Sequence, residues 1–327
     1  MPKTSCNLVL KNLNNLHPRV KQLIDQAGFG HILKIQPIEI NHHLIIALLE
    51  RWRTKTLTFH FPYREITMTL EDVVVQLGLP IDGEVITSIS SGDLVAWCEP
   101  LLGYLPPTGC ASGNMIKLSW LNNEFQQLPN DVDKVAFAQH TQAHILSLVG
   151  GLLMQNTISS WVHLMYLLLL LDLHSVSNYS WDHGIDFKQE NIEGCCSSNH
   201  GCVIESRVVS SHEKTTTPTY AMHIIRYMFD RLRTKEVQFL WTPYSKVELS
   251  CLINVKVSPI TCAFVPLICF TIVELHQANR VMRQFGFRQH IPLDPLNTDI
   301  LHKEDMRGRI NRYWPQYISP RMDCYME

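Results

Sequence analysis

The spacing of apolar residues changes twice between residues 39 and 78, and this change constrains the fold more than any other feature of the chain. Apolar side chains recur at helical spacing from Glu39 to Arg53, as expected for the buried face of a helix. Two runs rich in β-branched and aromatic residues follow, Thr56–Phe61 and Glu65–Met68, with Pro62–Arg64 as a turn between them. The segment therefore predicts a helix followed by a β-hairpin.

Both ends of the next helix are visible in the sequence. The Thr69 hydroxyl is placed to accept a hydrogen bond from the backbone amide of Asp72, whose carboxylate lies at the positive end of the helix. Gly78 suits the left-handed conformation that ends a helix, and Pro80 prevents the helix from continuing. We predict a capped helix here, followed by a fixed turn over Leu79–Gly83.

The remaining pattern is mostly helical. Further helices are predicted over residues 18–28, 133–153, 160–173, 220–232 and 265–285, and mostly loops over residues 88–130. The chain is therefore predicted to be mainly α, of the α+β class: a helical domain with a small β-hairpin near residues 56–69.

The amino-acid composition is that of a globular chain, and the net charge gives no overall positive potential. Of 327 residues, 46% are hydrophobic and 18% charged, which excludes a disordered protein, and the formal net charge is -2. The ten cysteines are scattered, and the start of the chain has no signal-peptide pattern, so we expect reduced thiols. The most apolar run, Trp161–Leu171, is shorter than the roughly 20 residues of a membrane span, so we predict a buried helix and no membrane anchor.

Two groups of residues have the side chains that bind zinc. His140 and His144 lie four residues apart on a predicted helix, but Thr141 stands where a zinc protease has glutamate, and a partly exposed helix face is the alternative. The other group could form a zinc knuckle, although incidental thiols in a disordered insert explain it as well. Its members are Cys195, Cys196, His200, Cys202 and His212.

The sequence contains no catalytic motif that we recognise. There is no G-x-S-x-G elbow, Walker A loop or G-x-G-x-x-G stretch. The pair Gly150–Gly151 has no nucleophile beside it, and we interpret it as a close-packing site or a helix break. We predict no catalytic residue, no metal ligand and no cofactor. A hydrolase remains an alternative, which would require a pocket where a Cys or His meets a carboxylate.

The best candidate binding site is the stretch from Arg280 to Pro292, in which arginines alternate with apolar residues. Arginine and aromatic side chains together contact phosphates and bases and are also enriched in protein interfaces. The predicted binding residues are Arg280, Arg283, Phe285, Phe287, Arg288 and His290. Farther along the chain, Arg307, Arg309, Arg312, Tyr313, Trp314 and Tyr317 continue the pattern.

A structural alternative for this stretch stays open. The aromatic residues would then close the core. The arginines would pair with Asp294, Asp299, Glu304 and Asp305.

Three separated blocks of the sequence resemble the plant mobile domain family, the module of proteins named after MAINTENANCE OF MERISTEMS that also occurs in plant transposons. The first comprises Leu23–Phe29, Leu48–Trp52, Phe59–Pro62 and Ile66–Gly83; the second Ala143–Leu146, Gly150–Leu153 and Tyr179–Trp181; the third Phe239–Tyr244, Val265–Phe270, Arg280–Pro292, Arg307–Arg309 and Trp314–Tyr317.

The resemblance implies a non-enzymatic plant protein of the nucleus. Members of the family are linked to meristem maintenance, development, genome stability and silencing of transposable elements. Some are fused to, or act with, a plant serine/threonine phosphatase whose long form carries this domain. The label "aminotransferase-like" also accompanies the family, but this chain has no lysine motif that would identify a pyridoxal-phosphate site.

The chain departs from the family after Trp181. There the family continues with a helical segment rich in leucine and tryptophan, which residues 183–217 replace, as a decayed element or through an error in the gene model. We predict the N-terminal part of the domain over residues 16–182, an aberrant or disordered insert over 183–218, and the C-terminal part over 219–318. Leu275 and Ala278 also stand where the family more often has tryptophan and proline.

The expected function is an interaction module with nuclear protein partners, a serine/threonine phosphatase among them. The alternative is a transposon-derived protein that binds nucleic acid through the C-terminal arginine and aromatic stretch.

Overall fold

The computed structural model describes residues 9–10, 12–13, 15–35, 42–62, 64–81, 83–86, 93–128, 133–154, 160–181, 208–210, 222–230, 237–239, 259–262, 265–269, 272–292 and 294. The predicted zinc-binding group at residues 195–212, most of the predicted insert and the arginines beyond residue 300 lie outside these residues. Of the predicted insert, Val208–Ser210 form strand β7, which pairs with β8 (Val237–Phe239).

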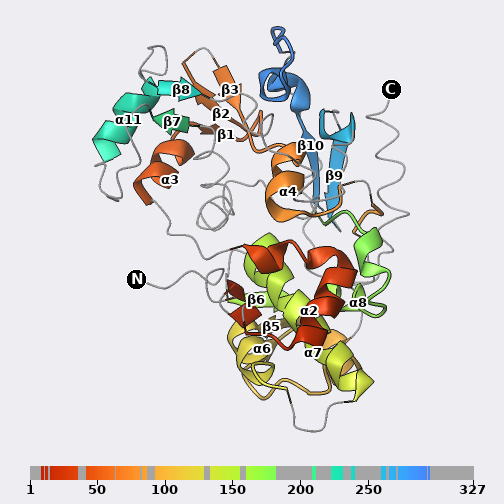
Figure 1. Ribbon diagram of the computed structural model, residues 1–327. Helices are drawn as coiled ribbons and strands as arrows, with labels where there is room; N and C mark the ends of the chain where they lie inside the picture. The colour runs from red at the N-terminus through yellow and green to blue at the C-terminus, as the bar shows by residue number, and fades with distance from the viewer. Residues whose placement is uncertain are drawn as a thin grey trace.

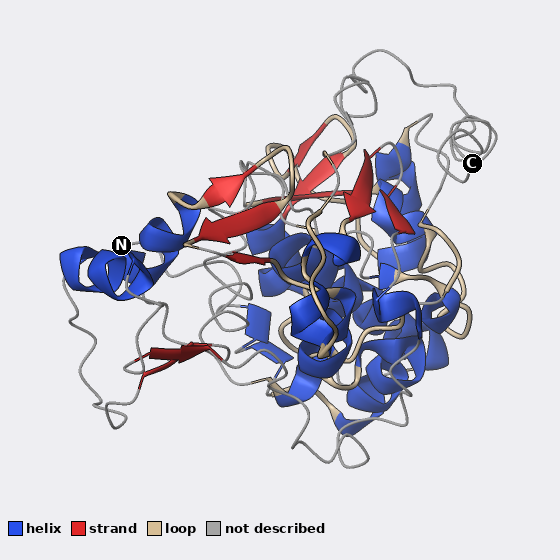
Figure 2. Cartoon of the chain, turned by 90° about the horizontal axis from the view of Figure 1, so that it is seen from above, coloured by secondary structure: helices blue, strands red, loops and turns tan. Residues whose placement is uncertain are grey.

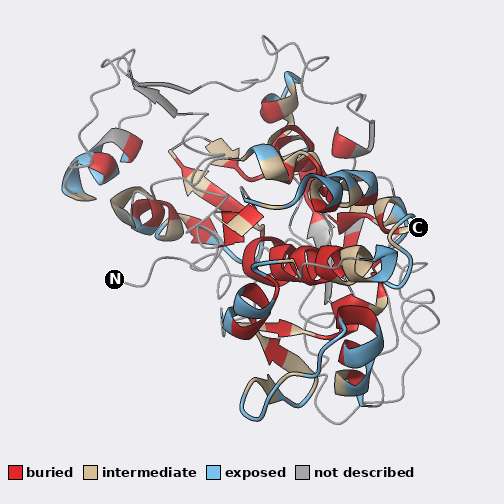
Figure 3. Cartoon of the chain, turned by 60° about the horizontal axis from the view of Figure 1, so that its bottom comes forward, coloured by how far each residue is buried: buried red, intermediate tan, exposed pale blue. Residues whose placement is uncertain are grey.

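A helical region surrounds α7 (Lys134–Leu148) in the lower half of Figure 1. The helices α2 (Pro18–Ile24), α5 (Cys98–Leu102) and α6 (Leu118–Glu124) pack against α7, which continues into the π-helical turn η4 (Val149–Leu153). The Asp133 carboxylate caps α7 by accepting a hydrogen bond from the amide of Ala136 at 2.7 Å. The predicted helix over residues 133–153 is confirmed, and the buried residues of the molecule concentrate in this region (Figure 3).

The paired glycines of η4 are a close-packing site. A Cβ atom added to Gly150 would lie less than 3.0 Å from the Val162 side chain, and one added to Gly151 would lie 2.8 Å from Val9. Val162 belongs to β6 (Trp161–His163), which pairs with β5 (Met115–Lys117). The absence of a side chain therefore lets the helix end contact the sheet, because protein cores have no spare volume for a methyl group.

A small antiparallel sheet in the upper half of Figure 1 confirms the predicted hairpin. Strands β2 (Thr58–Phe61) and β3 (Arg64–Ile66) form it, and β1 (Trp52–Arg53) adds a third strand beside β2. The preceding helix α3 (His42–Leu49) ends earlier than predicted, because Trp52 and Arg53 pair with β2 instead of continuing the helix.

Helix α4 (Leu70–Leu77) has both predicted ends. The Thr69 hydroxyl accepts from the Asp72 amide at 3.3 Å, and the Asp72 carboxylate accepts from the Thr69 amide at 2.8 Å. Gly78 ends the helix in the left-handed region at φ 67°. Thr69 and Asp72 are fully buried, so the capping box also satisfies polar groups that water cannot reach.

Helix α11 (Met222–Asp230), within the predicted helix over residues 220–232, packs on α3 and the hairpin. The Arg51 guanidinium lies 5.0 Å from the centre of the Phe229 ring and 5.7 Å from that of Phe61. Arg51 also forms an ion pair with Asp230 at 2.7 Å. These contacts fasten α11 to the hairpin and to the residue that precedes its sheet.

The predicted helix over residues 265–285 is wrong. The chain instead forms the antiparallel strands β9 (Val265–Cys269) and β10 (Ile272–His276), followed by two short 3-10 turns, η10 (Ala278–Arg280) and η11 (Met282–Phe285). A short apolar run is compatible with a helix or a buried strand. Pairing of all five residues of each strand decides between them. In Figure 2 the main group of helices lies on one side of the strands, and a smaller group of helices lies at the left.

Two other predictions also need correction. The apolar run after Ser160 is mostly buried, with Leu171 exposed, but it is β6 followed by the short helix α8 (Met165–Leu168) and turns, since β6 pairs with β5. Residues 94–124, predicted as mostly loops, contain the 3-10 turn η3 (Leu94–Trp97), α5, β4 (Ala111–Ser112), β5 and α6.

Short 3-10 turns connect other elements: η2 (Ile32–Lys34), η5 (Val176–Asn178) and η9 (Pro259–Cys262). The π-helical turn η1 (Asp25–Phe29) continues α2, which confirms the predicted helix over residues 18–28.

Candidate interaction site at the C-terminal arginine motif

The arginine motif folds into a compact loop that closes on itself. Gly286 adopts the left-handed conformation at φ 80°, and the amide of Phe287 donates to the Met282 carbonyl at 3.1 Å. The Gln289 side chain accepts from the amide of Met282 at 2.7 Å and donates to the Asn279 carbonyl at 2.9 Å. These bonds fix residues 279–289 in one shape without a regular helix or strand.

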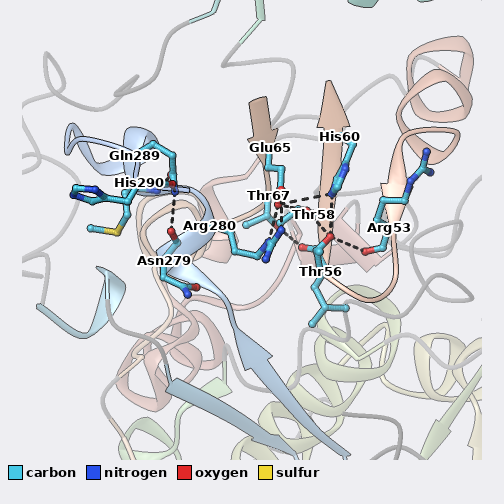
Figure 4. A network of polar contacts seen from close by, with 12 residues as sticks. Arg53, Thr56, Thr58, His60, Glu65, Thr67, Asn279, Arg280, Gln289 and His290 are labelled. Carbon is cyan, nitrogen blue, oxygen red and sulfur yellow. Dashed lines mark hydrogen bonds and ion pairs between the residues drawn. The ribbon is translucent and has the colours of Figure 1, made fainter. Parts of the chain in front are cut away.

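Arg280 fastens this loop to the N-terminal hairpin. Its guanidinium donates to both carboxylate oxygens of Glu65 on β3, with Nε–Oε2 at 2.8 Å and a terminal nitrogen to Oε1 at 2.9 Å. The two side chains are 10% and 18% exposed. Figure 4 shows Arg280 reaching from the C-terminal segment to Glu65. A bidentate pair shielded from water is the strongest form of this interaction.

Gln284 makes the second attachment. Its carboxamide oxygen accepts from the backbone amide of Thr67 at 2.9 Å, and its nitrogen donates to the Thr67 carbonyl at 2.8 Å. Gln284 is fully buried. The side chain therefore pairs with Thr67 as a neighbouring strand would, and it satisfies both backbone polar groups of this residue just beyond the end of β3.

The six predicted binding residues divide into two groups. Arg280 is bonded within the structure and Phe285 is half-buried, whereas Arg283, Phe287, Arg288 and His290 are exposed. Phe287 is 55% exposed, so it does not close the core. Arg280 pairs with Glu65, 215 residues away, which is not among the acidic partners that the structural alternative predicted. Three of those predicted partners, Asp299, Glu304 and Asp305, lie outside the described residues.

A polar network surrounds Glu65 on the hairpin (Figure 4). The Thr58 hydroxyl donates to Glu65 at 3.0 Å, and the Thr56 hydroxyl lies 2.7 Å from that of Thr58 and 3.1 Å from Nε2 of His60. Nε2 of His60 also lies 3.7 Å from Glu65. Burial alone would raise the pKa of Glu65, but hydrogen bonds and charge from Arg280 together with the Thr58 hydroxyl outweigh it and lower this pKa.

This network lacks the geometry of a catalytic relay. The hydroxyl of Thr56 and the carboxylate of Glu65 both face Nε2 of His60. In a hydrolase triad the nucleophile and the carboxylate occupy opposite ring nitrogens, so that the imidazole passes a proton between them. Burial lowers the pKa of His60 despite the opposing charge of Glu65, and the charges of Arg53 and Arg280 lower it further.

The pair His140 and His144 is buried, and the predicted alternative of a partly exposed helix face is wrong. His140 packs against the Phe125 ring at 5.1 Å between centroids. Burial first, and then the neighbouring His140, lower the pKa of His144 to about 4 despite a hydrogen bond to the Phe125 backbone. Within the described part of the chain, no three His, Cys, Asp or Glu side chains are grouped to hold a metal ion.

Blocks of the sequence that are far apart meet in the structure. The amide of Glu84, just after the predicted turn over residues 79–83, donates to the Asn178 carbonyl at 2.6 Å, and the Ser180 amide donates back to Glu84 at 2.9 Å. The Phe29 and Trp181 rings pack edge to face at 5.2 Å. The first block thus contacts the second through Phe29 and Trp181, and the third through Thr67 and Gln284.

The model of the family described as Plant mobile domain matches residues 28–184 and 199–327. This chain belongs to the plant mobile domain family. The match omits residues 185–198, which lie within the predicted insert and outside the described residues. The quoted sequence blocks fall within the matched ranges, except for residues 23–27 at the start of the first block.

Three curated relatives from Arabidopsis thaliana support the assignment. Protein MAIN-LIKE 1 is 33% identical over 85% of this chain and 60% of its own length. Serine/threonine-protein phosphatase 7 long form homolog is 32% identical over 91% of this chain but 25% of its own length, and Protein MAINTENANCE OF MERISTEMS is 29% identical over 91% and 69%. The chain thus spans a quarter of the phosphatase homologue and 60% of MAIN-LIKE 1. No solved structure matches.

No helix among the described residues is long and apolar enough to cross a bilayer.

Proposed function

We propose that this plant mobile domain protein acts without catalysis, as an interaction module of the nucleus. The processes we propose for it are meristem maintenance, development and silencing of transposable elements, with nuclear proteins and a serine/threonine phosphatase among its partners. The observation that carries the proposal is the use of the motif residues. Arg280 and Gln284 are bonded to Glu65 and to Thr67, so they hold the loop in place.

The same attachment leaves Arg283, Phe287, Arg288 and His290 exposed on a fixed loop. A rigid loop that displays arginine and aromatic side chains suits binding, since these residue types dominate the energetics of interfaces and little ordering entropy is lost. The Thr56 hydroxyl and the Glu65 carboxylate face the same ring nitrogen of His60, and this arrangement supports the non-catalytic part of the proposal.

Localisation and partner capture in plant cells test this proposal. We expect a fluorescent fusion of the full chain to accumulate in nuclei, and affinity capture from nuclei to enrich chromatin-associated or phosphatase-containing complexes. Exclusion of the fusion from nuclei, or recovery of cytosolic metabolic complexes alone, would contradict it. Turnover of a substrate by the purified chain, lost on His60→Ala, would overturn the non-catalytic part.

A nucleic-acid-binding function is the second candidate, because exposed arginines beside an exposed aromatic ring also contact phosphates and stack on bases. Salt-dependent binding to DNA that is lost in Arg283→Ala and Arg288→Ala would favour it. Retention of DNA binding in both variants would remove this loop as the binding site.

A further inference from the structure

We infer that the outer edge of β3 is a strand-addition site for the β3 of a second copy of this chain, and that residues 279–289 cover this edge until they are released. We call residues 279–289 the motif loop. The inference goes beyond the proposed function, because it concerns an interface between two copies that the folded chain keeps covered.

The backbone groups of Glu65 point away from the hairpin. In the sheet order β1-β2-β3 of the described residues, β3 is an outer strand. The amide of His60 on β2 donates to the Arg51 carbonyl at 2.8 Å, so the backbone of His60 faces the β1 side. Glu65 lies opposite His60, and two opposite residues of an antiparallel pair are either bonded to each other or both turned away. The amide and carbonyl of Glu65 are therefore directed outward.

Gln284 occupies the next outward position along this edge. Thr67 follows Glu65 by two residues, and backbone groups that face the same side recur at every second residue of a strand. The Gln284 carboxamide accepts from the Thr67 amide at 2.9 Å and donates to the Thr67 carbonyl at 2.8 Å. A residue of an added antiparallel strand would make the same two bonds. The side chain therefore takes the place of a strand.

The β3 of a second copy carries the groups that would replace Gln284. If two β3 strands pair antiparallel about a twofold axis at Ile66, the outward backbone of Glu65 in each copy faces Thr67 of the other. The Glu65 carbonyl then accepts from the Thr67 amide, and the Glu65 amide donates to the Thr67 carbonyl. No described residue is hydrogen-bonded to that outward amide or carbonyl within one chain.

The motif loop holds this edge closed through two attachments. Arg280 is paired with the Glu65 carboxylate at 2.8 Å, and Gln284 is bonded to Thr67. Ile66 and Thr67 are only 1% and 6% exposed. An uncovered strand edge is a template for pairing with another chain, and folded proteins commonly cover such edges with a loop. The two attachments therefore protect the chain against association through β3.

The geometry favours a second copy over an unrelated extended peptide. Only two residues of the described edge, Glu65 and Thr67, turn their backbone groups outward, which gives few main-chain bonds to hold a peptide. In a symmetric pair both copies donate and accept, so each bond forms twice. The two Ile66 side chains also lie directly opposite each other, where apolar side chains across a sheet stabilise the pairing.

Sedimentation and hydrogen exchange on the full chain test the inference. The release variant combines Arg280→Gln with Gln284→Ala, which removes both attachments of the motif loop. Gly150→Ala is the matched control, because it also introduces strain but lies in the helical region. A blocked form adds Glu65→Pro to the release variant, since proline at an outward position of an edge strand removes a donor without breaking the pairing with β2.

We expect the parent and Gly150→Ala to keep the same mass, and the release variant to form dimers as its concentration rises. The Thr67 amide of the release variant should exchange quickly in the dilute monomer. In the dimer its exchange should slow by at least about tenfold, because the amide is bonded again. The blocked form should keep the parent's mass at every concentration. If circular dichroism shows that the release variant is unfolded, Gln284→Ala alone is measured in the same way.

A release variant that keeps the parent's mass at all concentrations would overturn the inference. Equal association of Gly150→Ala would also overturn it, because destabilisation alone would then explain the dimer. A dimer in which the exchange of Thr67 is not slowed, or a blocked form that associates equally well, would place the contact elsewhere. A monomeric release variant that instead binds a labelled peptide of alternating valine and threonine would show that the edge accepts strands but not a second copy, which overturns the inference as well.

Discussion

The carboxamide of Gln284 pairs with both backbone polar groups of Thr67, 217 residues earlier in the chain. Together with the Arg280–Glu65 ion pair it joins the C-terminal motif to the N-terminal hairpin. This join determines which residues of the motif face solvent, so its integrity is the first property to test.

Gln284→Ala should destabilise the protein. The change leaves the buried amide and carbonyl of Thr67 without their partners, and each such group costs about 1–3 kcal/mol. Urea unfolding followed by circular dichroism measures the loss. Gln22→Ala, at an exposed position on α2, should change the free energy of unfolding by less than about 0.5 kcal/mol. Equal stability of the two variants would show that Gln284 does not hold the loop.

The ionisation of Glu65 should make the folding stability of the protein depend on pH. Its pKa is lower in the folded protein than in the unfolded chain, so its ionised form stabilises the fold above the unfolded pKa. This contribution is lost as the pH falls through the lowered folded pKa. Glu65→Gln should therefore be less stable than the parent at pH 7, and the difference should shrink as the pH falls below the ordinary pKa of glutamate. A difference that stays constant with pH would contradict the ion pair.

The size of this ion pair can be measured separately. A double-mutant cycle with Glu65→Gln and Arg280→Gln at pH 7 should give a coupling energy of about 1–3 kcal/mol, because the groups are in direct contact and shielded from water. Glu50→Gln with Arg226→Gln, an exposed ion pair between α3 and α11, is the comparison and should give a clearly smaller coupling energy, because water screens it. Equal coupling in the two cycles would mean that partial burial adds nothing.

His144 should cause a second loss of stability in acid. Its folded pKa of about 4 lies below the ordinary value of 6.5, so protons bind the unfolded chain preferentially. Its contribution is complete above pH 6.5, falls as the pH drops toward 4, and then levels off. His144→Gln should flatten this part of the stability profile, whatever its effect at neutral pH. A parent and a variant with identical slopes between these values would contradict the assignment.

Gly150→Ala should destabilise the helical region. The new methyl group would overlap the Val162 side chain, and overpacking of this kind costs about 1–3 kcal/mol. Gly113→Ala is the comparison, because a methyl group there meets no atom within 4 Å, although its backbone has φ 55°. The Gly150 variant should lose more stability in urea, and its near-ultraviolet spectrum should change. A smaller loss than for Gly113→Ala would exclude tight packing at η4.

Local sequence patterns were most informative where neighbouring residues complete a structure by themselves. The capping box of Thr69 and Asp72 and the left-handed Gly78 were predictable, because each depends on residues within one turn of helix. The hairpin over β2 and β3 was predictable for the same reason. The apolar segment of β9 and β10 was mistaken for a helix, since its strands are recognisable only once they pair.

The candidate site was predicted in part. The arginine motif was identified, but the separate roles of its residues were not, and Gln284 was not singled out although it is the most buried polar anchor. A glutamine within an arginine-rich stretch gives no signal of burial. The partner of Arg280 was also unpredictable, because the sequence places several carboxylates closer to it than Glu65.

The amino-acid sequence by itself determined the helix caps, the first hairpin and, through the spacing of three motif blocks, membership of the plant mobile domain family. Tertiary structure alone decided that Arg280 and Gln284 face inward while Arg283, Phe287 and Arg288 face outward. The physical reason is the separation along the chain of the residues involved. Caps and turns depend on neighbouring residues, whereas the burial and ion pairing of these side chains depend on residues that folding brings together from more than 200 positions away.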